Sequence, residues 1–142
     1  MVIRLTPDQC SSYWEDLSAG IKASMPPFSV VTEEGLNEIL RKLLAEDMHA
    51  WVMIEDGNVL ASAITSFQVD VGTGDNQLLI YSLFGYRFIK ETSWKEGVKV
   101  LGDFAAMHKC KKVIAYTCVP RIIEVAKSLG ASANYVFLHW EV

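Results

Sequence analysis

The sequence predicts a mixed α/β fold of the α+β type, in a single domain that spans residues 1–142. Three observations support this prediction. The N-terminal part repeats apolar residues at helical spacing, the central part has strand-like segments around tight-turn signals, and the C-terminal part alternates helix and strand. The resulting order is β-α-α-β-β-β-α-β-α-β. A chain of 142 residues with 51% hydrophobic side chains is large enough to bury one core.

The first element is a short strand, and a well-marked helix start follows it. Residues 2–5 form the strand, and the next four residues read "TPDQ". In this stretch Thr6 caps a helix, Pro7 takes the first helical position and Gln9 completes a capping box. The pattern therefore predicts that a helix begins at Pro7.

Two amphipathic helices then follow one another. The first has apolar residues at three- and four-residue steps through Ile21 and is ended by Pro26-Pro27. The second starts near Thr32 and repeats leucine and isoleucine at the same spacing through Leu44. Each helix has one apolar face to bury.

From residue 50 the pattern changes to strands. The stretches "AWVMIE" and "NVLASAITSFQV" flank Asp56-Gly57, a strong hairpin signal because both residues tolerate the positive φ of a tight turn. A second polar turn, "GTGDN", leads into "QLLIYSLFGYRF". The centre of the predicted sheet is therefore an antiparallel meander of three strands.

The C-terminal part begins with a helix inside "KETSWKEGVKVLGDFAAMHKC", residues 90–110. After it, "KKVIAYTC" predicts a strand, and "PRIIEVAKSL" predicts a helix that begins at Pro120 and is stopped by Gly130. The final stretch, "ANYVFLHWEV", predicts a last strand over residues 133–142.

Charge and cysteine content narrow the function classes. A net charge of -4, without a run of five like charges, gives little support to a nucleic-acid or anionic-membrane partner. The three cysteines lack C-x-x-C spacing, so we expect no disulfide framework and no metal site. No apolar run approaches the ~18 residues of a membrane span, and the N-terminus lacks the pattern of a signal peptide. We therefore expect a soluble, cytoplasmic protein.

Two stretches, taken with the order of elements, resemble the GCN5-related N-acetyltransferase (GNAT) superfamily. "HKCKKVIAYTCVPRIIEVAKSLGA" is similar to the family's strand, loop, helix and "LG" ending, and "EDGNVLASA" is similar to its second-to-third strand hairpin. The resemblance implies the GNAT-like acyl-CoA N-acyltransferase fold, with acetyl-CoA or another acyl-CoA as cosubstrate. It also implies that the cosubstrate lies where the fourth and fifth strands separate, with its pyrophosphate at the start of the next helix.

The helix start that would hold pyrophosphate departs from the family's pattern, which is Gln or Arg, two residues, Gly, one residue, Gly. Only Gly97 matches one of those glycines. The spacing of Ser93 and Glu96 instead predicts a capping box, which would occupy two backbone donors that a phosphate needs. Two interpretations stay open, an ordinary capped helix and a reworked CoA site. The candidate cofactor-binding residues are Thr92, Ser93, Trp94, Lys95, Gly97 and Arg121.

The catalytic positions implied by the resemblance are also altered. A glutamate general base on the fourth strand is absent, and Ala126 stands where the family usually has a tyrosine acid. The usual aromatic residue after "LG" is replaced by Ala131. The remaining candidates are Tyr81 and Tyr116, and each is also compatible with an ordinary strand aromatic.

Two functional hypotheses follow. The first is an acyl-CoA-dependent N-acyltransferase with a divergent pyrophosphate loop, acting on a small-molecule or protein amine. The second is a GNAT fold that has lost the chemistry and serves in binding or assembly. Its general character resembles small proteins encoded by tailed phages, which would place it in the host cytoplasm or the virion, with a homo-oligomer or virion components as partners.

Overall fold

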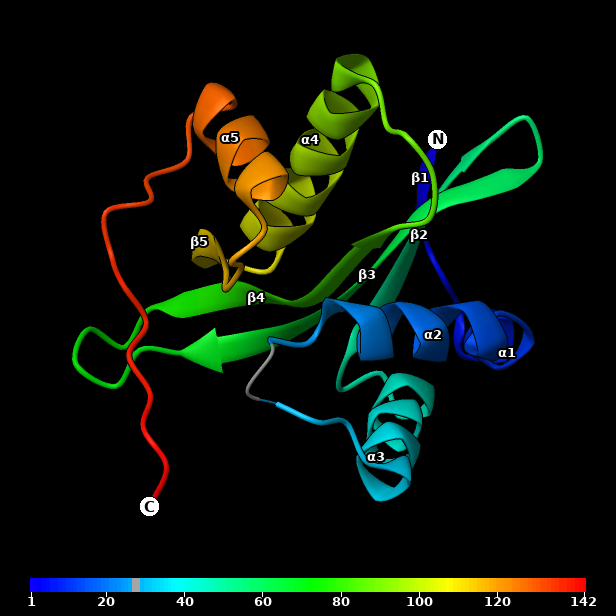
Figure 1. Ribbon diagram of the computed structural model, residues 1–142, viewed down its shortest axis with the longest axis horizontal. Coiled ribbons are helices and arrows are strands. Elements are labelled where there is room, and N and C mark those ends of the chain that lie inside the picture. The colour runs from blue at the N-terminus through cyan, green and yellow to red at the C-terminus, as the bar shows by residue number, and fades with distance from the viewer. Residues whose placement is uncertain (27–28) are drawn as a thin grey trace.

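The computed structural model describes residues 1–26 and 29–142, and its centre is a five-stranded sheet in the order β1-β2-β3-β4-β5 (Figure 1). The strands are β1 (Val2–Arg4), β2 (His49–Glu55), β3 (Asn58–Val69), β4 (Asn76–Gly85) and β5 (Cys110–Ala115). The first four strands are antiparallel neighbours, and β5 runs parallel to β4. The sheet is therefore mixed, with the antiparallel meander that the sequence predicts.

Helices cover both faces of this sheet (Figure 1). One face carries α1 (Pro7–Ser12), α2 (Trp14–Ser24) and α3 (Glu33–Leu44), and the other carries α4 (Glu91–Met107) and α5 (Pro120–Ser128). The core on the first face includes Leu17, Ile21, Leu43 and Val52. On the second face Trp51, Leu78 and Phe104 are buried together between the strands and α4. Burial of apolar area on both faces is what holds the three layers together.

Two predicted helix starts and the first predicted hairpin turn are confirmed. The Thr6 side chain accepts a hydrogen bond from the Gln9 amide at 3.3 Å, and the Gln9 side chain accepts one from the Thr6 amide at 2.9 Å. Thr32 caps α3, and Asp56 and Gly57 both have positive φ in the hairpin between β2 and β3. These features form because each depends only on residues a few positions apart.

The first predicted helix is divided into two. Tyr13 has a non-helical φ of -95° and ψ of 7°, and it ends α1 and precedes α2. Next to this break, the Ser12 hydroxyl donates to the Asp8 carbonyl at 3.2 Å, a side-chain bond of the kind that bends helices. Helix α2 ends at Ser24, before the prolines expected to stop it, and Pro27 lies outside the described residues.

The predicted last strand is wrong, because residues 131–142 have no regular secondary structure. In Figure 1 this segment, which we call the C-terminal tail, runs from α5 past the ends of β4 and β5. Its apolar side chains are exposed, including Tyr135, Val136, Leu138 and Trp140. A strand needs a neighbour for its backbone groups, and the adjacent edge, β5, is short and carries Lys111 and Lys112. Within the described ranges, no helix is long and apolar enough to cross a bilayer.

Candidate functional site

Strands β4 and β5 separate halfway along β4. Their parallel pairing ends where Ile80 meets Ala115, whereas β4 continues to pair with β3 as far as Gly85. In the described part of the chain, residues 82–85 are therefore paired on one side only. Backbone donors and acceptors on such an edge can bind an extended ligand as an added strand would.

A β-bulge lies at the point of separation. Ile64 pairs with Ser82 and Thr65 pairs with Ile80, which leaves Tyr81 as the extra residue of β4. A bulge interrupts the regular alternation of side chains and bends the strand. As a result Ile80 and Leu83, three residues apart, both face α4.

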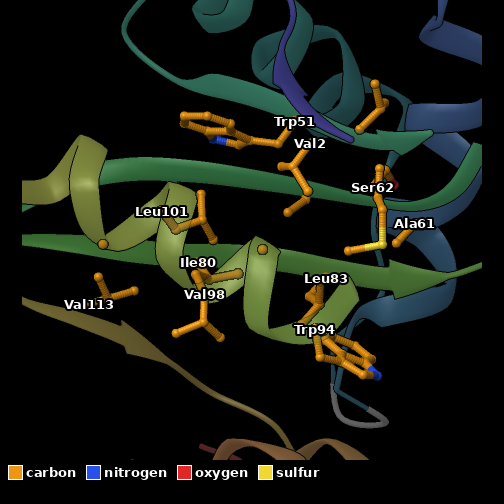
Figure 2. A pocket seen from close by; sticks show the side chains of 15 residues that line it. Val2, Trp51, Ala61, Ser62, Ile80, Leu83, Trp94, Val98, Leu101 and Val113 are labelled. Atoms are coloured by element: carbon orange, nitrogen blue, oxygen red, sulfur yellow. The ribbon is translucent and has the colours of Figure 1, made fainter. Parts of the chain in front are cut away.

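An apolar cavity of about 220 Å³ lies between the sheet and α4 (Figure 2). The strands contribute Trp51, Met53, Ala61, Ala63, Ile80 and Leu83, and α4 contributes Trp94, Gly97, Val98, Leu101 and Gly102. Val2 of β1 and Val113 of β5 also line it. The cavity exists because alanine and glycine occupy positions where larger side chains would fill the gap between helix and sheet. It therefore adjoins both the separation of β4 from β5 and the start of α4.

The start of α4 is not closed by the predicted capping box. The helix begins at Glu91, so Ser93 is already inside the first turn, and no side chain caps the helix. The Glu96 carboxylate instead accepts a hydrogen bond from the Val2 amide at 3.1 Å, which attaches α4 to β1. The prediction was wrong because the helix starts three residues earlier than expected, with Lys90 rather than Ser93 at the N-cap position. The first-turn donors are consequently not occupied by Ser93 or Glu96 side chains.

The lysines around this helix start are paired with carboxylates. The pairs are Lys90 with Glu55 at 3.1 Å, Lys95 with Glu91 at 3.2 Å and Lys99 with Asp103 at 2.6 Å. All three pairs are exposed, and exposed pairs contribute little to stability. An incoming phosphate can therefore compete for these ammonium groups at small cost.

The two predicted catalytic tyrosines lie in different settings. Tyr81 is the bulge residue of β4, and 40% of its surface is exposed. Tyr116 follows the last residue of β5 rather than lying on the strand; it is 63% exposed, and its ring centroid is 5.8 Å from that of Phe137 in the C-terminal tail. Tyr81 follows Ile80 and Tyr116 follows Ala115, the last pair of β4 and β5, so the structure brings both tyrosines to the point where the strands part.

The predicted cofactor-binding residues divide into two groups. Trp94 and Gly97 line the cavity, and Ser93 is buried beside them in the first turn of α4. Thr92 and Lys95 lie on exposed parts of the same helix, and Arg121 is an exposed residue in the first turn of α5. The candidate residues of α4 therefore gather at one helix end, whereas Arg121 belongs to the neighbouring helix.

A polar cluster on the opposite face of β4 was missed from the sequence. The Ser24 hydroxyl lies 2.9 Å from that of Ser82, and the Ser62 hydroxyl lies 2.9 Å from that of Tyr86. Burial raises the pKa of Tyr86, so its phenol stays protonated and donates to the Asp16 carbonyl. The signal in the sequence that could have revealed this cluster is the presence of serines within the apolar stretches of β3 and β4. The cluster fixes α2 against the same strand that carries the bulge.

A second buried polar group orients the wall of the cavity. The Trp51 indole N–H donates to the Thr65 hydroxyl oxygen at 2.9 Å, and His49 Nδ1 lies 3.2 Å from the same oxygen. Burial lowers the pKa of His49, with the Arg4 charge as a second cause. The ring of Trp51 is therefore held in place by a partner outside the cavity. Among the described residues, no group of three or more His, Cys, Asp or Glu side chains is placed to hold a metal ion.

Comparison with known proteins identifies the fold. No family model matches the sequence, and no curated protein matches it. An aminoglycoside N-acetyltransferase in complex with CoA has a similar structure, with a TM-score of 0.74 at 13% identity, covering 100% of this chain and 93% of that one. The chain has the GNAT fold. The expected fold class is thereby confirmed.

Two further structures with the GNAT fold match over nearly their whole length. Ribosomal-protein-alanine N-acetyltransferase from Brucella melitensis biovar Abortus 2308 has a TM-score of 0.69 at 16% identity, covering 100% of this chain and 99% of that one. Glucosamine-6-phosphate N-acetyltransferase from Arabidopsis thaliana has a TM-score of 0.68 at 17% identity, covering 99% and 97%. At sequence identities this low, the comparison shows a shared fold only. The chemistry has to be argued from the site.

Proposed function

We propose that this protein is an acyl-CoA-dependent N-acyltransferase. The observation that supports the proposal best is the early end of the β4–β5 pairing, at Ile80, beside the bulge at Tyr81 and the uncapped start of α4. This combination offers backbone groups, an apolar space and a helix N-terminus to one elongated ligand. The names of the similar structures agree, since each is an acetyltransferase and one contains CoA.

The residues present fit the three parts of an acyl-CoA. The free edge of residues 82–85 suits the amide groups of the pantetheine arm. The positive end of the α4 dipole, with Thr92 and Lys95 in its first turns, suits the pyrophosphate, and Arg121 supplies a further charge from α5. Trp94 and Gly97 then face the thioester end. Bound acyl-CoA would supply the activated acyl group.

The chain's own residues have a limited part in the chemistry. When an amine attacks the thioester carbonyl, a C–N bond forms, the C–S bond breaks, the nitrogen releases a proton to solvent and the thiolate takes one up. We assign this proton to the phenol of Tyr81, because Tyr81 is the less exposed of the two tyrosines at the separation of β4 and β5, at 40% against 63%; Tyr116 is the alternative donor. The amine acceptor, as in the similar enzymes, would be a small molecule or a protein.

Binding and turnover test this proposal separately. Acetyl-CoA at a hundred times its Kd should stabilise the fold by about 2.7 kcal/mol, measured as a shift in the unfolding midpoint. Turnover is followed as release of free CoA thiol with a panel of amines. Tyr81→Phe should lower kcat by about a hundredfold and leave the Kd for CoA unchanged, with Tyr116→Phe as the matched control. Absence of any CoA binding up to millimolar concentration would refute the proposal.

A second candidate function, a noncatalytic binding or assembly protein, is favoured by the C-terminal tail. Its exposed Tyr135, Val136, Leu138 and Trp140 form an apolar stretch of the kind that marks interaction sites. If this function holds, light scattering should give the mass of an oligomer, and Val136→Asp with Leu138→Asp should return it to a monomer. A wild-type monomer that turns over acyl-CoA would argue against it.

A further inference from the structure

We propose that the cavity under α4 binds the acyl chain of the donor, and that the enzyme therefore prefers medium-length acyl groups to acetyl. This inference rests on the proposed acyltransferase function and extends it to the class of acyl group. Four properties of the cavity support it: its position, its entrance, its lining and its size.

The position follows from the bulge. Ile80 and Leu83 line the cavity, and Tyr81 between them is the residue at which β4 leaves β5. A thioester placed at this separation therefore has the cavity directly beside it. The acyl chain can pass from the strand edge into the space under α4 without crossing a layer of the fold.

The entrance lies between α4 and β5. Val98 on α4 and Val113 on β5 both line the cavity, and 50% and 41% of their respective surfaces are exposed. Trp51, Met53 and Ala63 on the strands are buried, and Val2, Ile80 and Leu83 are half-buried. The cavity is thus open on the side from which a ligand in the β4–β5 separation would enter, and closed on the sheet side.

The lining selects an apolar occupant. The polar side-chain atoms of its sheet residues already have partners: the Trp51 indole N–H donates to Thr65, and the Ser62 hydroxyl is bonded to Tyr86. None of the described residues that line the cavity has an ionisable side chain. An amine or carboxylate would lose its hydration there without replacement, whereas methylene groups gain about 0.8 kcal/mol each on burial. The amine acceptor is therefore excluded, and the hydrocarbon chain is favoured.

The size matches a chain longer than acetyl. A cavity of about 150 Å³ in an engineered protein holds benzene, so the cavity of about 220 Å³ here can hold a chain of roughly six to eight carbons. Its volume can also be reduced by substitution. A Cβ on Gly102 would meet no atom within 4 Å, and Ala63 is a buried residue of the opposite wall.

The test compares the Kd values of acetyl-, hexanoyl- and octanoyl-CoA, measured by calorimetry. We expect affinity to rise by about fourfold for each methylene until the cavity is full. Gly102→Leu or Ala63→Leu should abolish this dependence on chain length and leave the Kd for acetyl-CoA unchanged. Gly102→Ala is the matched control, and it should keep most of the preference. Two filling variants on opposite walls guard against one that fails to fold.

Each outcome gives a decision. If acetyl-CoA and octanoyl-CoA bind equally well, the inference is overturned while the proposed function stands. If no CoA ester binds, the proposed function fails. Free octanoate is then titrated against tryptophan fluorescence, because Trp51 and Trp94 line the cavity. A response that Ala63→Leu abolishes would assign the cavity to free fatty acids and overturn its assignment to an acyl donor.

Discussion

Gly20 offers a quantitative test of how α2 is seated on the sheet. A Cβ added at this position would lie 2.8 Å from the Ser62 hydroxyl oxygen, 2.8 Å from the Tyr86 hydroxyl oxygen and 3.4 Å from Phe84 Cβ. Ordinary contacts begin at 3.4 Å, so both oxygens would have to move by about 0.6 Å. They are bonded to each other at 2.9 Å, so they cannot move independently without losing that bond.

The expected magnitude for Gly20→Ala is the difference between two effects. Alanine improves the helix by about 0.5–1 kcal/mol. Overpacking costs about 1–3 kcal/mol, and the loss of the Ser62–Tyr86 bond adds about 1 kcal/mol. We therefore expect the free energy of unfolding to fall by about 1–3 kcal/mol. Urea denaturation followed by circular dichroism measures this change.

A matched substitution separates packing from helix propensity. Gly102 also lies inside a helix, but a Cβ there meets nothing within 4 Å, so Gly102→Ala should raise stability by about 0.5–1 kcal/mol. Tyr86→Phe removes one of the two oxygens, and in that background Gly20→Ala should cost less. Equal gains from Gly20→Ala and Gly102→Ala would refute the close packing of α2 on β3 and β4.

Three further predictions concern charged and titrating groups. Burial lowers the pKa of His49, so below about pH 6.5 His49 takes up a proton more readily in the unfolded chain than in the folded one. The free energy of unfolding should therefore decrease as the pH is lowered. Urea denaturation of His49→Gln between pH 7.5 and 5 should show a smaller decrease in the free energy of unfolding. The same dependence on pH as in the wild type would contradict this prediction. Glu96→Ala should cost about 1 kcal/mol by releasing the Val2 amide and should leave the Kd for CoA unchanged; tighter CoA binding would restore the capping-box hypothesis. Glu91→Gln frees Lys95 and should tighten CoA binding by about twofold to fivefold at low salt, an effect that should disappear at high salt. The absence of any salt dependence in calorimetry would show that Lys95 does not contact the phosphates.

The features that were predictable from the sequence are those set by neighbouring residues. Thr6 with Gln9 fixes the start of α1, and Asp56-Gly57 fixes the hairpin of β2 and β3. Their geometry depends on a few adjacent φ and ψ angles and on one or two short hydrogen bonds. The order of elements then follows from periodicity, and that order was sufficient to indicate the GNAT fold.

The errors arose where a local pattern competes with a distant contact. Ser93 and Glu96 have the spacing of a capping box, yet the Glu96 carboxylate binds the Val2 amide, 94 positions away in the sequence. The C-terminal tail has the composition of a strand, yet a strand also requires an accepting edge, and β5 with Lys111 and Lys112 does not pair with it. The cavity was likewise invisible, because it depends on which small residues face each other across α4 and the sheet.

The candidate site consists mainly of backbone geometry and of small residues, which explains why it lacks a side-chain motif. The separation of β4 from β5 and the bulge at Tyr81 supply backbone groups, and on the proposed function such groups would recognise the constant part of a CoA ester. Selectivity must then come from elsewhere. On the proposed function, the wall containing Gly102 would select the acyl chain, whereas Ser24 and Ser82 lie on the opposite face of β4, under α2. Substitutions at Gly102 should therefore change the preference for the acyl chain and leave the contact between α2 and β4 unchanged, because the two lie on different faces of one strand.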